Sequence, residues 1–293
     1  MPADLPLQTP VQMPIHQVSF HFPRVLSIAG SDSGGGAGIQ ADLKTISALG
    51  CFGMTAITAL TAQNTQGVRA IHAVPPQMLA DQIDAVLEDI GVDAVKIGML
   101  HSPDIVRTVA QAIARHAMHN VVFDPVMVAT SGAVLIDDSA IAVLVQELFP
   151  QVALITPNLD EAALLVKRPL QSEGDMQEAA TTLLAMGARA VLLKGGHLQG
   201  EVVSDLLAVA GGQTLWMRDA RIHTPNTHGT GCTLSSAIAS HLALGQDLVQ
   251  AVQSARRYIR GALLHGAQVR TGHGSGPLNH GYAPVAMVLQ TAP

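Results

Sequence analysis

The residues best suited to chemistry lie near the C-terminus, in the stretch NTHGTGC (Asn226 to Cys232). Gly229, Thr230 and Gly231 form a turn of small residues, and the helix-compatible run TLSSAIASHLAL follows it. Such a turn can point backbone N–H groups at one spot, at the positive end of the helix. That arrangement suits the charge that develops on a phosphoryl group during transfer. The stretch therefore predicts an anion hole formed by Gly229, Thr230 and Gly231.

Cys232 comes directly after this turn, in the first turn of the expected helix. A helix N-terminus lowers the pKa of a cysteine below its free value of ~8.5, and a thiolate can accept the proton of a substrate hydroxyl. The alternative is that Cys232 is a small buried residue without a chemical role. His228 either contacts a phosphate or makes a hydrogen bond within the loop. The 13 histidines show no metal-binding spacing such as HExxH.

A glycine-rich segment, SDSGGGAGIQADL, follows the apolar run VLSIAG. Its residues 36–41 match the loose GxGxxA pattern of dinucleotide binding. That pattern also needs an acidic residue about 20 positions later, and no Asp or Glu occurs between Asp42 and Asp81. A Rossmann oxidoreductase is therefore disfavoured. The glycines either serve a ligand or only let a helix and a strand pack closely.

Polar side chains stand at the ends of other apolar runs. The amide of Gln63 carries a donor and an acceptor side by side, so it can pair with a ring nitrogen and an amino group, or it caps a loop. Asp124 and Glu161 offer the oxygen ligands that Mg²⁺ prefers, although Glu161 also fits the first turn of a helix. Lys194 either meets a phosphate or lies in solvent.

Strand-like and helical patterns alternate from Arg24 onward, which predicts an α/β fold with a mostly parallel sheet. We expect buried strands at 25–30, 54–64, 94–100, 121–127, 153–158 and 190–196. Helices are expected at 39–50, 76–90, 103–116, 139–148, 159–166, 175–186, 232–244 and 247–265. Residues 202–210 and 214–222 predict an antiparallel pair at the sheet edge. Ligands of such folds bind beyond the carboxyl ends of the strands, where the polar residues above stand.

The composition narrows the class of protein. The 293-residue chain is 48% hydrophobic, with 3% aromatic residues, a net charge of -6 and no basic runs, so neither nucleic acid nor an anionic membrane is expected as a partner. Cys51 and Cys232 make no disulfide framework and fit a reducing cytoplasm. Residues 1–22, without Lys or Arg, predict a flexible tail that matches no secretory signal or transit peptide. Residues 23–293 predict one domain.

Seven motifs of the chain resemble, in order and spacing, those of the hydroxymethylpyrimidine/phosphomethylpyrimidine kinases of thiamine biosynthesis, in the ribokinase superfamily. They are GSDSGGGAGIQADLKT, ITALTAQNTQGV, KIGML, DPVM, ITPNLDEA, LLKGGH and NTHGTGCTLSSAIA. The resemblance implies a ribokinase-like three-layer fold, with a mostly parallel central sheet flanked by helices. It also implies a homodimer that uses ATP to phosphorylate 4-amino-5-hydroxymethyl-2-methylpyrimidine, and then the monophosphate to the diphosphate.

The same resemblance implies roles for single residues. Cys232 stands where most ribokinase relatives carry an aspartate base. The pyrimidine is held by Gln63, with a pocket lined by Gly30, Asp42, Met99 and Val126. Mg²⁺ is organised by Asp124 and Glu161, and ATP is served by Asn158, Lys194 and Thr227, with His228 as a further candidate.

Two alternative functions remain open at this point. A pyridoxal or pyridoxine kinase of the same superfamily also acts on a ring hydroxymethyl group. A non-catalytic pyrimidine-binding protein is the other alternative, and Asp124 and Glu161 argue against it because binding alone needs no Mg²⁺. No long insertion follows the second expected strand, so we expect a short loop near residues 130–133 to cover the ring.

Overall fold

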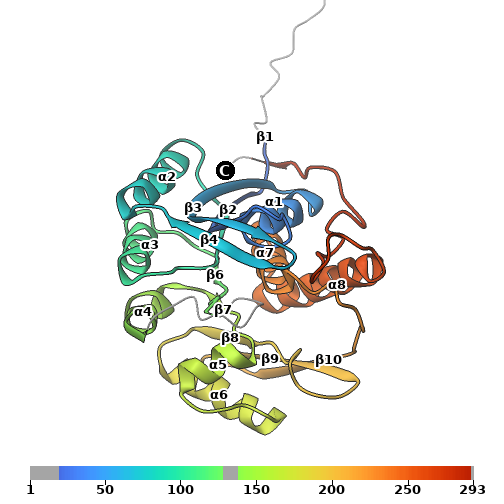
Figure 1. Ribbon diagram of the computed structural model, residues 1–293. Coiled ribbons are helices and arrows are strands. Elements are labelled where there is room, and N and C mark those ends of the chain that lie inside the picture. Colours follow the sequence, from blue (N-terminus) through green and yellow to red (C-terminus); the bar gives the residue numbers. More distant parts are fainter. Residues whose placement is uncertain (1–19, 128–137, 292–293) are drawn as a thin grey trace, which may run out of the picture.

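The computed structural model describes residues 20–127 and 138–291, and a single nine-stranded sheet forms its centre (Figure 1). The strand order is β10-β9-β8-β7-β6-β5-β2-β3-β4. The parallel strands are β2 (Arg24–Asp32), β3 (Phe52–Asn64), β5 (Ala94–Ile97), β6 (Val121–Phe123), β7 (Leu154–Ile155) and β8 (Ala190–Leu193). Every residue of β5, β6, β7 and β8 is buried, as expected of strands covered on both faces.

Antiparallel strands close both edges of the sheet. β9 (Val202–Val209) and β10 (Thr214–Ala220) form the predicted pair at one edge. β4 (Gly67–Ala73) forms a hairpin with β3 at the other edge. The sequence analysis did not predict β4, because most of its residues are exposed and its short apolar side chains show no clear alternation.

Helices cover both faces of the sheet, which gives the three layers expected from the resemblance (Figure 1). One face carries α2 (Pro76–Asp89), α3 (Pro103–Arg115), α4 (Asp138–Val143), α5 (Leu159–Val166) and α6 (Glu173–Ala185). The other face carries α1 (Gly38–Ala48), α7 (Thr230–Ala243) and α8 (Leu248–Gly266). Each expected helix is confirmed to within a few residues. The one expected at 139–148 is α4 continued by a π-helix, Leu144–Leu148, and a 3-10 turn, Phe149–Gln151.

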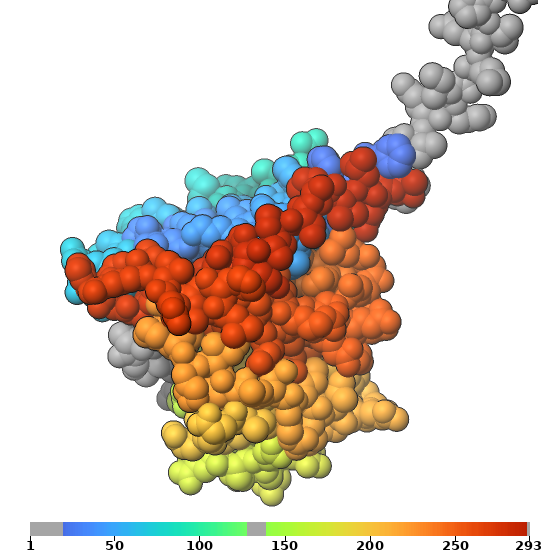
Figure 2. Space-filling view, turned by 90° about the vertical axis from the view of Figure 1, so that its right-hand side faces the viewer, coloured from blue at the N-terminus to red at the C-terminus, as the bar shows by residue number. Residues whose placement is uncertain are grey.

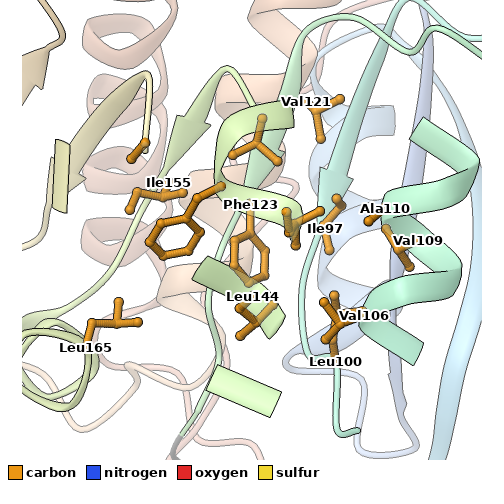
Figure 3. Close-up of a cluster of buried hydrophobic side chains, with 14 of the residues drawn as sticks. Ile97, Leu100, Val106, Val109, Ala110, Val121, Phe123, Leu144, Ile155 and Leu165 are labelled. Carbon is orange, nitrogen blue, oxygen red and sulfur yellow. The ribbon is translucent and has the colours of Figure 1, made fainter. Parts of the chain in front are cut away.

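Each helical layer packs an apolar core against the sheet. Figure 3 shows Phe123 of β6 and Ile97 of β5 facing Leu144 and the α3 residues Val106 and Val109. Fully burying one side chain of this size stabilises the fold by about 1.5–3 kcal/mol. The two cores hold the strands in place, and the strands in turn position the loops that follow their ends.

The two described ends of the chain meet in a small ribbon. β1 (Phe20–His21) pairs antiparallel with β11 (Gln290–Thr291), and Phe20 lies opposite Thr291. The C-terminal segment, red in Figure 2, runs along the blue N-terminal part to reach it. Of the expected tail, residues 1–19 lie outside the described residues, as does the segment 130–133. None of the described helices is long and apolar enough to cross a membrane.

Candidate active site

A cavity of about 640 Å³ opens at the carboxyl ends of the parallel strands. From β2 the chain passes to β3 on one side and later reaches β5 on the other, so the loops after β2 and β5 diverge there. Such a switch point is where open α/β sheets bind ligands. Because β5, β6 and β8 end earlier than expected, Met99, Asp124 and Lys194 stand just beyond them. The cavity is lined by every predicted site residue except Asp42.

The predicted anion-hole turn opens α7. Gly229 is the N-cap with φ +85°, and a Cβ there would overlap the Gly36 carbonyl oxygen, so only glycine fits. A Cβ on Gly231 would come within 3.1 Å of Asp124 Oδ2, so this glycine brings the helix start close to the carboxylate. Within the described part of the chain, the N–H groups of Gly231 and Cys232 have no acceptor. They are open to an anion at the helix N-terminus.

Cys232 lines the cavity, but its pKa is shifted opposite to the sequence-based expectation. Burial raises the pKa of the Cys232 thiol to about 11, because desolvation outweighs the nearby Lys96 ammonium, and Asp42 and Asp124 raise it further. The N–H of Gly38, the first residue of α1, also favours the thiolate, yet not enough. The prediction of a lowered Cys232 pKa is therefore wrong, and the thiol keeps its proton at neutral pH.

Two ion pairs lie buried under this cavity. Lys96 Nζ lies 2.8 Å and 2.9 Å from the two oxygens of Asp42, and both side chains are completely buried. Ser27 and Ser236 donate to the same carboxylate at 2.6 and 2.7 Å. Asp42 therefore does not line the pocket as expected. It lies behind Lys96, which does line it, because the carboxylate is fully used in holding the ammonium in place.

The second pair joins Asp124 to Lys194, with Lys194 Nζ 2.8 Å from Asp124 Oδ1. Thr156 Oγ1 donates to the same oxygen at 2.9 Å. Burial raises the pKa of Asp124, but Lys194 and Lys96 outweigh burial and leave it below its usual value. Asp124 is therefore a charged carboxylate at neutral pH, held at the floor of the cavity.

Glu161 and Asn158 cap α5 together. Asn158 Oδ1 accepts from the Glu161 N–H at 2.9 Å, and Glu161 Oε2 accepts from the Asn158 N–H at 2.8 Å. The helix-terminus interpretation of Glu161 is thus confirmed for one carboxylate oxygen. Burial raises the pKa of Glu161 to about 7, partly offset by Lys194, and the negative charge of Asp124 raises it further.

The carboxylates of Asp124 and Glu161 are compatible with Mg²⁺ bound partly through water. Both line the cavity, and oxygen ligands are the kind that this ion prefers. The raised pKa of Glu161 reflects a buried carboxylate short of positive charge, which a divalent ion would supply. Among the residues that the structure describes, no cluster of three or more His, Cys, Asp or Glu forms a complete metal site.

Less polar residues form the opposite end of the cavity, after β2 and β5. A Cβ on Gly30 would come 2.9 Å from Met99 Cε, so the missing side chain lets Met99 reach into the wall. Thr58 Oγ1 donates to the Met99 carbonyl at 2.9 Å and holds that loop. Val126 and the Gln63 amide also line this end of the cavity, so its wall is partly apolar and partly polar.

The glycine-rich loop after β2 binds a carboxylate of its own chain. Asp32 Oδ1 accepts from the Gly34 N–H at 2.8 Å, and Oδ2 accepts from Gly36 and Ala37 at 3.1 and 2.9 Å. These are the N–H groups that a phosphate loop would offer to its ligand. The dinucleotide interpretation therefore loses its remaining support. Sequence analysis missed Asp32, although an Asp before a run of glycines is a signal for such a turn.

His228 makes hydrogen-bond contacts within the loops that line the cavity. Its Nε2 atom lies 2.9 Å from Asp32 Oδ2 and 3.4 Å from Gln63 Nε2. The alternative left open for His228, a hydrogen bond within the loops, is what the structure shows. Its ring therefore lies toward the Gln63 end of the cavity.

Two further parts of the lining were not predicted. β4 contributes Val68 and Ile71, so the β3–β4 hairpin forms a wall where the sequence showed no insertion. Near Lys194, the cavity also has polar and charged residues that only the three-dimensional fold brings together, and these are Asp160, His197, Asp205, Arg221, Arg256 and Arg260. Asp160 and His197 fall within the motifs ITPNLDEA and LLKGGH, although neither was singled out, and no motif marks the other four.

Residues 32–279 match the family model described as phosphomethylpyrimidine kinase. The chain belongs to this family. The hydroxymethylpyrimidine/phosphomethylpyrimidine kinase of Escherichia coli is 48% identical over 259 residues, with 88% of this chain and 97% of that protein covered. The thiamine biosynthesis bifunctional protein ThiED of Geobacter sulfurreducens is 51% identical over 88% of this chain, which spans only 53% of that longer protein.

Solved structures of the family and of related kinases share the fold. The crystal structure of phosphomethylpyrimidine kinase from Clostridium difficile has 42% identity and a TM-score of 0.72, covering 82% of this chain and 99% of that one. The pyridoxal kinase of Staphylococcus aureus in complex with AMP-PCP and pyridoxal has 32% identity and a TM-score of 0.81, with 89% and 94% covered. The ribokinase-like architecture expected from the sequence is confirmed.

Proposed function

We propose that this phosphomethylpyrimidine kinase family member transfers the γ-phosphoryl group of ATP to 4-amino-5-hydroxymethyl-2-methylpyrimidine, and then a second one to the monophosphate, in thiamine diphosphate biosynthesis. The observation that carries the proposal is the layout of one cavity. The same cavity is lined by Cys232 and the start of α7, by the Gln63 amide with its less polar neighbours, and by the buried Asp124–Lys194 pair. Relatives with 97% of their length covered bear the name of this activity.

The residues divide the work by position. Gln63, Gly30, Met99 and Val126 bind the ring, while Asn158, Lys194 and Thr227 bind the nucleotide. The open N–H groups of Gly231 and Cys232, at the end of the predicted turn, donate to the phosphoryl group as charge develops on it, whereas the Thr230 N–H is donated to the Thr227 carbonyl. When bound by Asp124 and Glu161, Mg²⁺ supplies positive charge to the phosphate oxygens.

In this proposal Cys232 accepts the proton of the substrate hydroxyl. Because the pKa of its thiol is raised to about 11, Cys232 must first release its own proton to solvent, and the thiolate then takes the proton of the attacking hydroxyl. Lys96 is the buried cation that favours the thiolate, and Asp42 holds it in place. The second acceptor is an ionised phosphate, which needs no base.

A coupled assay with ATP and Mg²⁺ tests the proposal on three acceptors, which are the hydroxymethylpyrimidine, its monophosphate and pyridoxal. Turnover of both pyrimidines is expected, and turnover of pyridoxal alone would overturn the proposal. Pyridoxal remains a second candidate because several structural neighbours are pyridoxal kinases. Cys232→Ala should slow the first transfer more than the second, whereas equal losses would mean that Cys232 only positions substrate.

The remaining expectations from the sequence have no structural test. The two cysteines are free, as a reducing cytoplasm would keep them. The cytoplasmic location and the homodimer stay predictions.

A further inference from the structure

A row of three side chains connects three separate parts of the site. Asp32 lies at the end of β2, His228 lies in the turn before α7, and Gln63 lies near the end of β3. The His228 ring packs directly on Gly36, because a Cβ at that glycine would overlap His228 Cδ2. The side chains of Asp32 and His228 are only 4% and 11% exposed. The row is therefore built into the cavity wall.

The first contact fixes the proton of the histidine. Burial raises the pKa of Asp32, but hydrogen bonds from His228 and from the backbone of Ala37 and Gly34 outweigh it and leave the pKa below its usual value. An ionised carboxylate can only accept hydrogen bonds. His228 Nε2, 2.9 Å from Asp32 Oδ2, must therefore carry a hydrogen and donate it. This atom cannot at the same time accept a hydrogen bond from Gln63.

The second contact concerns which way the Gln63 amide faces. Its Oε1 lies 3.1 Å from Thr61 Oγ1, and its Nε2 lies 3.4 Å from His228 Nε2. Thr61 Oγ1 has one hydrogen, and the Ser31 carbonyl at 2.9 Å can take it. Thr61 is then an acceptor and His228 a donor. The two ends of an amide have the same shape, so its partners decide the orientation.

We propose that Asp32 and His228 are positioning residues that hold the Gln63 amide with its carbonyl toward His228 and its NH₂ group toward Thr61. In this orientation the Gln63 carbonyl shares the one Nε2–H that His228 donates to Asp32, and the Gln63 NH₂ group donates to Thr61. In the opposite orientation two N–H donors face each other at His228. One N–H and one carbonyl lone pair of Gln63 then remain free, side by side, toward the cavity. The Asp32–His228 pair thereby determines where Gln63 offers its N–H donor and where it offers its carbonyl acceptor to a ligand.

The consequence is a selection between two kinds of ring, and it rests on the proposed function. The aminopyrimidine substrate offers an amino donor beside a ring-nitrogen acceptor. The corresponding pyrimidin-4-one offers a carbonyl acceptor beside an N–H donor, which is the reverse pattern. An amide held in one orientation matches only the first, whereas an amide that can turn over matches either.

Calorimetric titration of the nucleotide-free protein with both rings tests this inference. The wild type should bind 4-amino-5-hydroxymethyl-2-methylpyrimidine at least ~10-fold more tightly than 5-hydroxymethyl-2-methylpyrimidin-4-one, since a mismatched buried hydrogen bond costs at least that much. His228→Ala should reduce the ratio to within about 3-fold of one. The fold of this variant should persist, because the backbone N–H of residue 228 donates to the Gly276 carbonyl at 3.2 Å and does not depend on the side chain.

His228→Gln is the conservative rescue, because its amide can place an N–H donor near Asp32, and it should restore most of the discrimination. His119→Ala, an exposed histidine far from the cavity, is the matched control and should keep the wild-type ratio. An unchanged ratio in His228→Ala would overturn the positioning role, even if both affinities fell together. If the wild type neither binds nor phosphorylates the aminopyrimidine, the proposed function fails and the inference falls with it.

Discussion

The protonation state of Cys232 gives the most direct test of the site. Its pKa of about 11 leaves roughly 0.03% thiolate at pH 7.5, against roughly 10% for a free thiol of pKa ~8.5. Since thiolates of higher pKa are more nucleophilic, with a Brønsted coefficient of about 0.4–0.5, the net reaction with a small disulfide should be ~20–30-fold slower than that of a free thiol. The rate should rise about tenfold per pH unit from pH 7 to 10.

Mass spectrometry after timed labelling reads each cysteine separately. Cys232 lines the cavity and is open to a small reagent, whereas Cys51 is buried in the core and has a pKa raised to about 12. The chain unfolded in urea supplies the free-thiol rate, and Cys232→Ala identifies the signal. Restricted access would lower the rate at every pH without moving the plateau. A rate that levels off near pH 8.5 would therefore refute the reasoning that burial dominates over Lys96 and the helix N-terminus.

Two further predictions concern stability. Lys96→Met leaves a buried carboxylate unpaired and should lower the free energy of unfolding by about 3–5 kcal/mol in urea titrations. Arg107→Met breaks two exposed pairs, with Asp104 and Glu147, and should cost at most about 1 kcal/mol. A loss of unfolding free energy as large as that of Lys96→Met would contradict the argument. Gly229→Ala and Gly245→Ala share a φ near +85° and its strain of about 1–2 kcal/mol. Only the new methyl group at position 229 overlaps the Gly36 carbonyl, so Gly229→Ala should lower the free energy of unfolding by about 1–3 kcal/mol more than Gly245→Ala. Equal losses of stability in thermal denaturation would refute this.

Local patterns in the sequence predicted the α/β fold with its mostly parallel sheet, and the family resemblance added the ribokinase-like three layers. Each buried parallel strand is an apolar run that ends in Gly or a polar residue, and helix starts such as Ser102-Pro103 carry their own capping signal. Because ligands bind at the carboxyl ends of such strands, the polar residues that follow the strands were predicted to form one site. The cavity does bring them together, except for Asp42.

What the sequence could not supply depends on neighbours distant along the chain. The pKa of Cys232 follows from burial and from the balance of surrounding charges, and a helix-start position alone gave the wrong sign. Asp42 was predicted to line the pocket, but its partner Lys96, 54 positions away along the chain, holds it behind the pocket wall. His228 and Asp32 are 196 positions apart. β4 was missed because an exposed edge strand needs little apolar patterning.

The β1–β11 ribbon determines where additional polypeptide would emerge. β1 leads directly into the start of β2, so both described ends of the chain leave at the amino ends of the strands, opposite the cavity mouth. A second catalytic unit joined at either end would depart from nearly the same point and leave the entrance clear. The Geobacter relative of which the chain spans 53% is named a bifunctional protein.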